Sequence, residues 1–178
     1  MMSLPRVLTL DQNHDLRLQV APAVEKLRQR EQVFRPAGNG EQDRAQIARR
    51  RIENCCGEVV CSFRRGMEPF VVSLVSETAD AKPWLTIRYD PSEPNFLTVD
   101  ERSVPLDGVG RGEIEIQGYI DRSVIETIVN RRSAYTKRLY HSGSSAPPIA
   151  MQVEGRTESL SLLSLWQMTP TSADRLTT

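Results

Sequence analysis

The chain lacks long hydrophobic runs. Its 178 residues contain no apolar stretch of the roughly 18 residues that a membrane-spanning helix requires. The N-terminal segment also lacks the apolar core of a secretion signal. We therefore expect a cytoplasmic protein with no membrane partner. A secreted protein whose leader has been removed is the open alternative.

Histidine and cysteine are scarce. His14 and His141 are the two histidines and stand far apart in the sequence, so no metal site or Ser-His-Asp triad is suggested. The three cysteines, Cys55, Cys56 and Cys61, are odd in number, and adjacent cysteines are strained partners in a disulfide. We expect reduced, partly buried thiols, with no metal and no cofactor.

An excess of charge of one sign is also missing. The 23 Lys and Arg residues balance 23 Asp and Glu residues, which gives a formal net charge of zero. That balance removes the long-range positive field on which non-specific nucleic-acid binding depends. Short basic clusters at residues 49–51, 64–65 and 131–132 are typical of solvated strand and turn residues, and a phosphate-binding patch is the less favoured interpretation. We expect no nucleic-acid partner.

Short alternating runs of apolar and polar residues dominate the sequence. Residues 113–120 and 124–129 form two such runs around Asp121, Arg122 and Ser123, as expected for β-strands joined by a polar corner. Further strands are predicted at residues 58–64, 70–76, 84–89, 96–99, 134–140, 149–153 and 159–168. Closely spaced strands without intervening helices predict an all-β, antiparallel sandwich of two packed sheets.

The N-terminal part predicts a separate arm. Two alternating runs, residues 6–10 and 16–20, flank a cluster of turn-forming residues and predict a hairpin. Pro22 suits the first turn of a short helix, which we place at residues 23–32. Residues 41–52 have helical spacing, but we assign no helix there because strands follow at once. The predicted organisation is a connector arm at 1–34, a sandwich at 35–169 and a polar tail at 170–178.

Two motifs resemble a known family. The segments Tyr119-Ile-Asp-Arg-Ser-Val-Ile-Glu-Thr-Ile-Val-Asn130 and Tyr135-Thr-Lys-Arg-Leu-Tyr140 are similar to the C-terminal sandwich module of glycoside hydrolase family 32, the invertases, inulinases and levanases. Residues 4–28 resemble the connector that leads from the family's five-bladed propeller into this module. Residues 162–168, with Trp166, resemble its closing strand. The resemblance implies a sandwich of the concanavalin or jelly-roll type.

The resemblance marks a set of signature residues that we expect to be structural. In a corner of this kind, Asp121 and Ser123 can bond nearby backbone donors, and Arg122 can pair with Glu126. The sequence departs from the family pattern at Ile128 and at Arg131-Arg132. The full signature set is Asp121, Arg122, Ser123, Glu126, Asn130, Arg138 and Tyr140.

The catalytic motifs of the resembled family are absent from this sequence. The family's propeller supplies the carboxylates through Asn-Asp-Pro-Asn-Gly, Arg-Asp-Pro and Glu-Cys motifs. The segment Arg88-Tyr89-Asp90-Pro91 comes near one of them, but it is interrupted by the tyrosine and predicts a turn. We expect no catalytic residue in this chain, although its parent family consists of glycosidases that hydrolyse O-glycosyl bonds. An enzyme with an unrecognised site is a further hypothesis.

The resemblance predicts an accessory module. Its expected partner is a catalytic propeller, either as a domain or as a separate chain, and a second copy of the chain is another candidate partner. The alternative function is an independent carbohydrate-binding module for fructans, since sugar rings stack on aromatic side chains. The candidate sugar platform is Trp84, Tyr89 and Tyr119.

Overall fold

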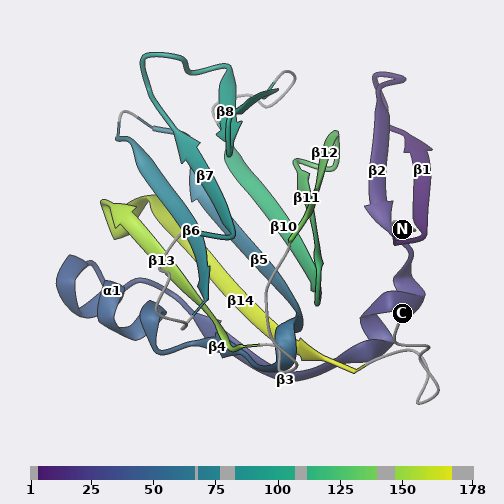
Figure 1. The fold of residues 1–178 in the computed structure, drawn as a ribbon. Coiled ribbons are helices and arrows are strands. Elements are labelled where there is room, and N and C mark those ends of the chain that lie inside the picture. The colour runs from purple at the N-terminus through teal and green to yellow at the C-terminus, as the bar shows by residue number, and fades with distance from the viewer. Residues whose placement is uncertain (1–3, 67, 77–82, 107–111, 140–146, 170–178) are drawn as a thin grey trace.

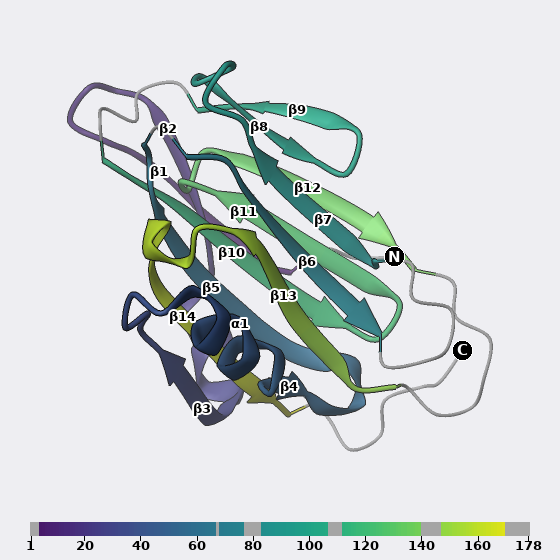
Figure 2. The ribbon, with the colours of Figure 1, turned by 90° about the vertical axis from the view of Figure 1, so that its left-hand side faces the viewer.

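The protein is a β-sandwich with an additional N-terminal hairpin. A computed structural model describes residues 4–66, 68–76, 83–106, 112–139 and 147–169. Its strands form two six-stranded antiparallel sheets and one two-stranded sheet, arranged as Figures 1 and 2 show. The predicted two-sheet sandwich is confirmed. In the described part of the chain, no helix has the length and apolar character needed to cross a membrane.

The arm-side sheet is the large sheet that lies against the N-terminal hairpin. Its order is β12-β11-β10-β5-β14-β3, with every neighbouring pair antiparallel. In that order the strands are Ser133–Arg138, Val124–Val129, Glu113–Asp121, Cys56–Arg64, Leu160–Met168 and Arg28–Phe34.

The far sheet forms the second layer. Its order is β4-β13-β6-β7-β8-β9, again antiparallel throughout. In that order the strands are Arg51–Ile52, Ile149–Gly155, Phe70–Ser76, Leu85–Tyr89, Phe96–Val99 and Arg102–Pro105.

The main core lies between these two sheets. Along β10, Ile114, Ile116 and Ile120 are buried in it, and Glu115, Gln117 and Tyr119, which alternate with this row, lie on the opposite face, as the two-residue period of a strand requires. Phe63 of the arm-side sheet stacks on Phe70 of the far sheet with ring centroids 3.9 Å apart. Alternation in the sequence thus positions one apolar layer and leaves the outer face of the arm-side sheet for other contacts.

A helix forms where we assigned none. Helix α1, Gly40–Ala48, packs against β13 and fully buries Ile47. Buried Asp43 accepts hydrogen bonds from the Ala37 amide at 3.2 Å and from the Thr157 hydroxyl at 3.3 Å. The assignment from neighbouring strands was wrong, and the local helical spacing was right, because Ile47 and Asp43 both have partners in the sandwich.

The arm is shorter than the sequence predicts. It consists of β1, Arg6–Leu10, β2, Leu16–Val20, and a 3-10 helix η1, Pro22–Leu27. The predicted helix at 23–32 is wrong in its second half, since Arg28–Phe34 is strand β3 at the edge of the arm-side sheet. Pairing with β14 overrides the local helical signal there. We use the word arm below for residues 4–27.

Most other strands lie where the sequence places them. The strands predicted at residues 6–10, 16–20, 70–76 and 96–99 are confirmed with the same bounds. Strands β4 and β9 are not predicted, because β4 has two residues and β9 ends in Pro105, which weakens the strand signal. Pro105 is tolerated because β9 is an edge strand of the far sheet.

Candidate docking surface on the N-terminal arm

A row of polar and aromatic residues crosses the outer face of the arm-side sheet. In register, Glu126 of β11 lies opposite Tyr119 of β10, Tyr119 opposite Glu58 of β5, and Glu58 opposite Trp166 of β14. Paired residues of adjacent strands point to the same face, so these four side chains form one line. Glu58 and Glu126 are buried, with exposures of 0% and 2%, because the arm covers this face.

Glu58 is held by the arginine that directly follows the arm. Arg28 donates two hydrogen bonds to it, Nε to Oε2 and Nη2 to Oε1, each of 2.7 Å, and Gln117 donates a third of 2.9 Å. The Arg28 guanidinium also lies 4.4 Å from the ring centroid of Trp166. The hydrogen bonds to Glu58 raise the pKa of Arg28 above its ordinary value. This bidentate pair, stacked on an indole, fixes the point where the arm enters the sandwich.

Glu126 is held by the beginning of the arm. Its carboxylate accepts a hydrogen bond from the Leu4 amide at 3.1 Å and an ion-paired hydrogen bond from Arg6 at 3.1 Å. Arg6, and not the predicted Arg122, is therefore the arginine that pairs with Glu126. The prediction failed because Glu126 points to the outer face of the sheet, where the arm supplies the cation.

The Asp121 corner is a tight backbone turn. Arg122 has a φ of 51°, and its amide donates to the Cys55 carbonyl at 2.7 Å. The Ser123 carbonyl accepts from the Leu139 amide at 2.7 Å, which links the corner to the end of β12. Arg138 is exposed on β12, while Tyr140 lies outside the described residues. The signature segment thus shapes the β10–β11 connection and carries Glu126 on the next strand.

Asn130 begins the turn between β11 and β12. Asn130 and Arg131 have φ values of 51° and 55°, and the Arg132 amide donates to the Val129 carbonyl, as in a type I′ hairpin turn. The Asn130 side chain accepts from the Glu115 amide at 2.8 Å. Asparagine tolerates the left-handed conformation well, which explains its place at the first of the two positions.

The same turn holds the hairpin of the arm in place. The Leu18 amide donates to the Arg131 carbonyl at 2.7 Å, and Arg132 pairs with Asp15 at 2.6 Å. Asp11 accepts hydrogen bonds from Arg17 and from the amides of Asn13 and Asp15, so the hairpin tip is also closed internally. Arg131 and Arg132, which depart from the family pattern, are therefore contacts of the arm.

An apolar cluster joins the arm to the sheet. Val20 and Val24 of the arm pack on Tyr119, Ile128 and Met168. Burial raises the pKa of the Tyr119 phenol, and the neighbouring Glu58 carboxylate raises it further. Ile128, the other departure from the family pattern, fills this cluster. The base of the arm is thus bound by apolar packing and by two buried ion pairs.

The hairpin carries leucines that remain exposed. Leu8, Leu10 and Leu16 are 62%, 64% and 55% exposed. In register, Leu8 pairs with Leu18 and Leu10 with Leu16, so the three residues share a face with Leu18 and Val20 at the base. We call Leu8, Leu10 and Leu16 the leucine face. It continues the buried cluster outward into solvent, which is the arrangement expected of a docking surface.

The two buried glutamates do not resemble a glycosidase pair. A retaining glycosidase holds its carboxyl groups about 5 to 5.5 Å apart, whereas two strand spacings separate the backbones of Glu58 and Glu126 by about 10 Å. Both carboxylates are bound by arginines under the arm. Within the described ranges, no group of three or more His, Cys, Asp or Glu residues could hold a metal ion.

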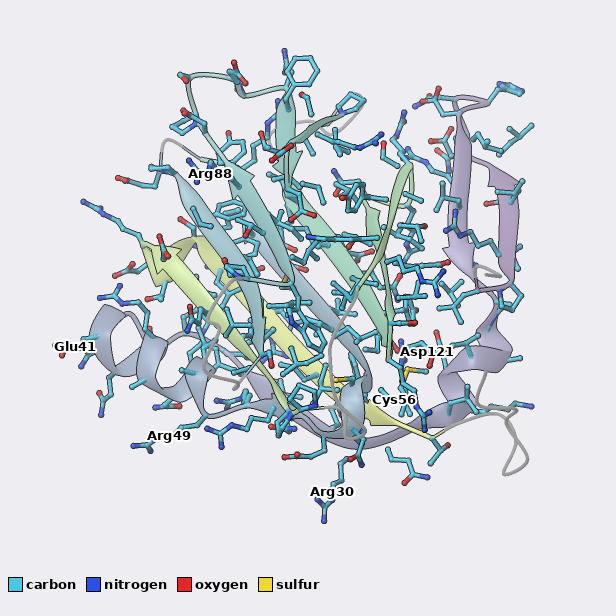
Figure 3. All side chains as sticks on the ribbon, viewed as in Figure 1. Arg30, Glu41, Arg49, Cys56, Arg88 and Asp121 are labelled. Carbon is cyan, nitrogen blue, oxygen red and sulfur yellow. The ribbon has the colours of Figure 1, made fainter. Side chains whose placement is uncertain are left out.

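The candidate sugar platform is divided among different parts of the sandwich. Tyr89 is 1% exposed in the main core, and Tyr119 is 4% exposed beneath the arm. Trp84 precedes β7 in the far sheet and packs partly against the main core. The structure does not bring these three rings together on one surface. Figure 3 shows the side chains as sticks on the ribbon, with the exposed Arg30, Glu41 and Arg49 extending away from it.

Sequence inspection missed the two ion pairs that hold the arm. Arg28 precedes Glu58 by 30 residues, and Arg6 precedes Glu126 by 120 residues, so no local pattern links them. One signal was present: Glu58 is a charged residue near the start of a mostly apolar strand, and such a residue requires a cation when it is buried.

The fold is similar to parts of longer solved enzymes. Sucrose-6-phosphate hydrolase from Lactobacillus gasseri matches with a TM-score of 0.64 and 16% identity, over 92% of this chain and 33% of that one. The β-fructofuranosidase from Schwanniomyces occidentalis, complexed with fructosyl-erythritol, matches with a TM-score of 0.61 and 13% identity, over 94% of this chain and 40% of that one. A glycoside hydrolase family 32 structure from Bifidobacterium adolescentis matches with a TM-score of 0.57 and 12% identity, over 94% of this chain and 25% of that one.

These matches confirm the predicted resemblance at the level of the fold. The chain is covered almost completely, while it covers well under half of each enzyme. That coverage fits one module of a longer fructosidase, as the sequence predicts for a C-terminal module.

Sequence comparison gives a shorter match. Recombination protein RecR from Brucella melitensis is 27% identical over 107 residues, which are 56% of this chain and 51% of that protein. This chain therefore spans about half the length of that curated relative. No family model matches the chain. At this identity and coverage, the match does not assign the chain to a family.

Proposed function

We propose that this chain is the non-catalytic β-sandwich of a family 32-like, β-fructosidase-class system, and that it docks on a catalytic propeller and stabilises it. The propeller is either a domain of the same protein or a separate chain. The arm is the docking element, and the leucine face is the part that contacts the propeller. The observation that carries this proposal is the exposed leucine face on a hairpin whose base is firmly bound to the sandwich.

The energetics favour docking through this face. Burial of a leucine side chain contributes roughly 1.5 to 3 kcal/mol, so covering three leucines contributes several kcal/mol. The hairpin is already ordered by its contacts with Arg131 and Arg132, which lowers the entropy cost of binding. The charges at its tip are paired within the hairpin or with Arg132, so an apolar partner meets no unpaired ion.

Fructosidase activity in purified complexes tests the proposal. The tagged chain is isolated from its native cells, and sucrose and fructan hydrolysis are measured in the eluate. We expect hydrolysis with the wild-type chain, none with the chain purified alone from another host, and a large loss with Leu10→Asp. Thr9→Asp is the matched control, because it places the same charge on the opposite face of the same strand. Absence of activity with the wild-type chain would contradict the proposal.

A glycan-binding role is the second candidate, and one feature favours it. Phe96 is 44% exposed and lines a surface recess of about 400 Å³ with Glu93, Pro94, Asn95 and Ser103. An aromatic ring beside hydrogen-bonding side chains suits a sugar ring. Calorimetric titration with inulin- and levan-type oligosaccharides tests this role, with Phe96→Ala as the variant. Absence of binding heat at millimolar oligosaccharide would contradict the glycan-binding role.

A further inference from the structure

Asn39 and Gly40 form the single Asn-Gly pair of the sequence, at the start of helix α1. Asn39 is the N-cap residue, and Gly40 is the first residue of the helix. Asparagine is a chemically labile residue, because the backbone nitrogen of the next residue can attack its side-chain amide. A glycine in the next position has no Cβ to hinder that attack. The pair is therefore a candidate site of deamidation.

The fold leaves this pair open to reaction. Asn39 is exposed, and its side-chain amide donates a hydrogen bond of 2.9 Å to the Gln42 side chain at the surface of the helix. The Asn39 side chain makes no capping bond to the helix backbone. The Gly40 N–H lies in the first turn, where a helix offers no backbone partner to its N–H groups. Water thus reaches the Asn39 side chain, and the Gly40 nitrogen is not engaged in the helix.

The other asparagines of the chain lie in less reactive settings. Asn13, Asn54, Asn95 and Asn130 are followed by His, Cys, Phe and Arg, whose side chains crowd the attacking nitrogen. The Asn95 and Asn130 side chains also accept hydrogen bonds of 2.8 Å from other parts of the sandwich. These four residues are internal standards for the reactivity of Asn39.

Asn39 lies inside a closed loop of hydrogen bonds. Its carbonyl accepts from the Asp43 amide at 2.8 Å, as in the first turn of a helix. The buried Asp43 carboxylate accepts from the Ala37 amide at 3.2 Å and from the Thr157 hydroxyl at 3.3 Å. The chain between Ala37 and Asp43 is thus closed on itself and bound to the sandwich. A change of backbone length at residue 39 would disturb all three bonds.

We propose that Asn39 is a site of spontaneous deamidation, with water as the co-reactant. The Gly40 nitrogen forms a bond to the side-chain carbonyl carbon of Asn39, and the bond from that carbon to Nδ2 breaks. Ammonia leaves with the proton of the Gly40 N–H, and a succinimide ring remains. Water then opens the ring. Opening at the side-chain carbonyl gives aspartate, and opening at the main-chain carbonyl gives an isoaspartyl linkage, in which the backbone runs through the side-chain carbons.

The two products differ in their effect on α1. Aspartate keeps the normal backbone, and it is a favoured N-cap residue at the positive end of a helix. The isoaspartyl linkage lengthens the backbone by a methylene group, and the carbonyl that accepted from Asp43 becomes part of a free carboxylate. The closed loop through Asp43 then no longer fits, and α1 loosens from β13, against which it packs.

This modification is independent of the proposed docking. Figure 1 shows α1 and the N-terminal hairpin on opposite sides of the sandwich. Aged chain that loses the contacts of α1 is therefore expected to keep its leucine face, so failure of either proposal leaves the other intact.

Peptide mass analysis of aged protein tests the site. Wild-type chain is incubated in mildly alkaline buffer and digested with trypsin, and fragment ions locate each amide-to-acid conversion. The tryptic peptide of residues 31–44 contains Asn39 and no other asparagine. We expect Asn39 to convert at least about tenfold faster than each of the other asparagines, and Gly40→Ala to slow it by about tenfold or more. The added methyl group fits, because its nearest neighbour would be the end of the Arg44 side chain at 3.4 Å.

Hydrogen exchange tests the effect on the helix. The Asp43 amide is compared in fresh wild-type chain, in aged wild-type chain and in Asn39→Asp, which carries the aspartyl product in every molecule. We expect a population in the aged chain that exchanges about tenfold faster or more. Exchange in Asn39→Asp should match or be slower than that of the fresh chain.

Three results would overturn the inference. Conversion of Asn39 at the rate of the other asparagines, or equal conversion in wild type and Gly40→Ala, would reject the site. Exchange at Asp43 that is the same in fresh and aged chain would reject the loosening of α1. The comparison among asparagines uses wild-type chain alone, so it holds even if Gly40→Ala fails to fold.

Discussion

The base and the tip of the arm differ in which side chains are buried and which are exposed. At the base, two glutamates are buried, and each is paired with an arginine that belongs to the arm or directly follows it. Toward the tip, leucines are exposed and the ion pairs lie at the surface. The base holds the arm on the sheet, while the leucines toward the tip stay exposed.

If the chain docks as proposed, this difference separates attachment of the arm from recognition of the partner. Buried ion pairs are costly to break, because removal of one partner leaves an uncompensated charge. Exposed leucines cost little to the isolated chain and become favourable only when another surface covers them. Substitutions at the base should therefore change stability, and substitutions at the tip should change association.

The largest effect is expected at Arg28. Arg28→Met leaves the fully buried Glu58 carboxylate without its bidentate partner, which should lower the free energy of unfolding by about 3 to 5 kcal/mol. Urea denaturation measures this loss. Adding Glu58→Met in the same chain should recover much of it, since the uncompensated charge is then gone.

The control for Arg28 is its second, exposed acidic neighbour. Glu25 lies 3.6 Å from Arg28 and is 60% exposed, so Glu25→Gln should change stability by less than about 0.5 kcal/mol. Equal losses from Glu25→Gln and Arg28→Met would mean that burial of Glu58 is not what makes the pair important.

Arg6 should give a smaller loss than Arg28. Arg6→Met removes one hydrogen-bonded ion pair from Glu126, which keeps its bond from the Leu4 amide. We expect the free energy of unfolding to fall by about 1 to 3 kcal/mol, again by urea denaturation. A loss greater than that of Arg28→Met would reverse the ranking of the two ends of the arm.

The sequence predicted the strands of the hairpin better than it predicted the contacts that hold the arm on the sheet. The bounds of β1 and β2 follow from alternation and turn residues, and the leucines are visible in the printed sequence. The partners of Glu58 and Glu126 were not predictable, because they depend on the order and register of strands that are distant along the chain. The same limit explains why Glu126 was assigned to nearby Arg122.

Local signals were weakest where tertiary contacts decide the structure. Residues 28–32 were predicted to continue a helix but belong to β3, which pairs with β14. Residues 40–48 are helical because Ile47 and Asp43 find buried partners. The platform of Trp84, Tyr89 and Tyr119 was proposed from residue type alone. Which sheet face each ring occupies depends on register, and Tyr89 lies in the main core while Tyr119 lies under the arm.

The ion pair at the hairpin tip should contribute less than either pair at the base. Arg132 and Asp15 are 19% and 46% exposed, so solvent screens their interaction. Arg132→Ala should cost less than about 1 kcal/mol. Its effect should appear instead as faster amide exchange at Leu18, whose bond to the Arg131 carbonyl depends on the position of that turn. Unchanged exchange at Leu18 would show that Arg132 does not help to hold the hairpin.

The smallest effect on stability is expected on the leucine face itself. Leu10 and Leu16 are more than half exposed, so the double variant Leu10→Ser/Leu16→Ser should alter the free energy of unfolding by no more than about 0.5 kcal/mol. Val20, on the same face but 8% exposed at the base, is the matched contrast, and Val20→Ser should cost about 2 kcal/mol or more. Urea denaturation compares them directly, while binding of a hydrophobic dye should fall in the leucine variant alone. Equal destabilisation of tip and base would mean that the leucines already stabilise the isolated fold, and the separation of attachment from recognition would then be lost.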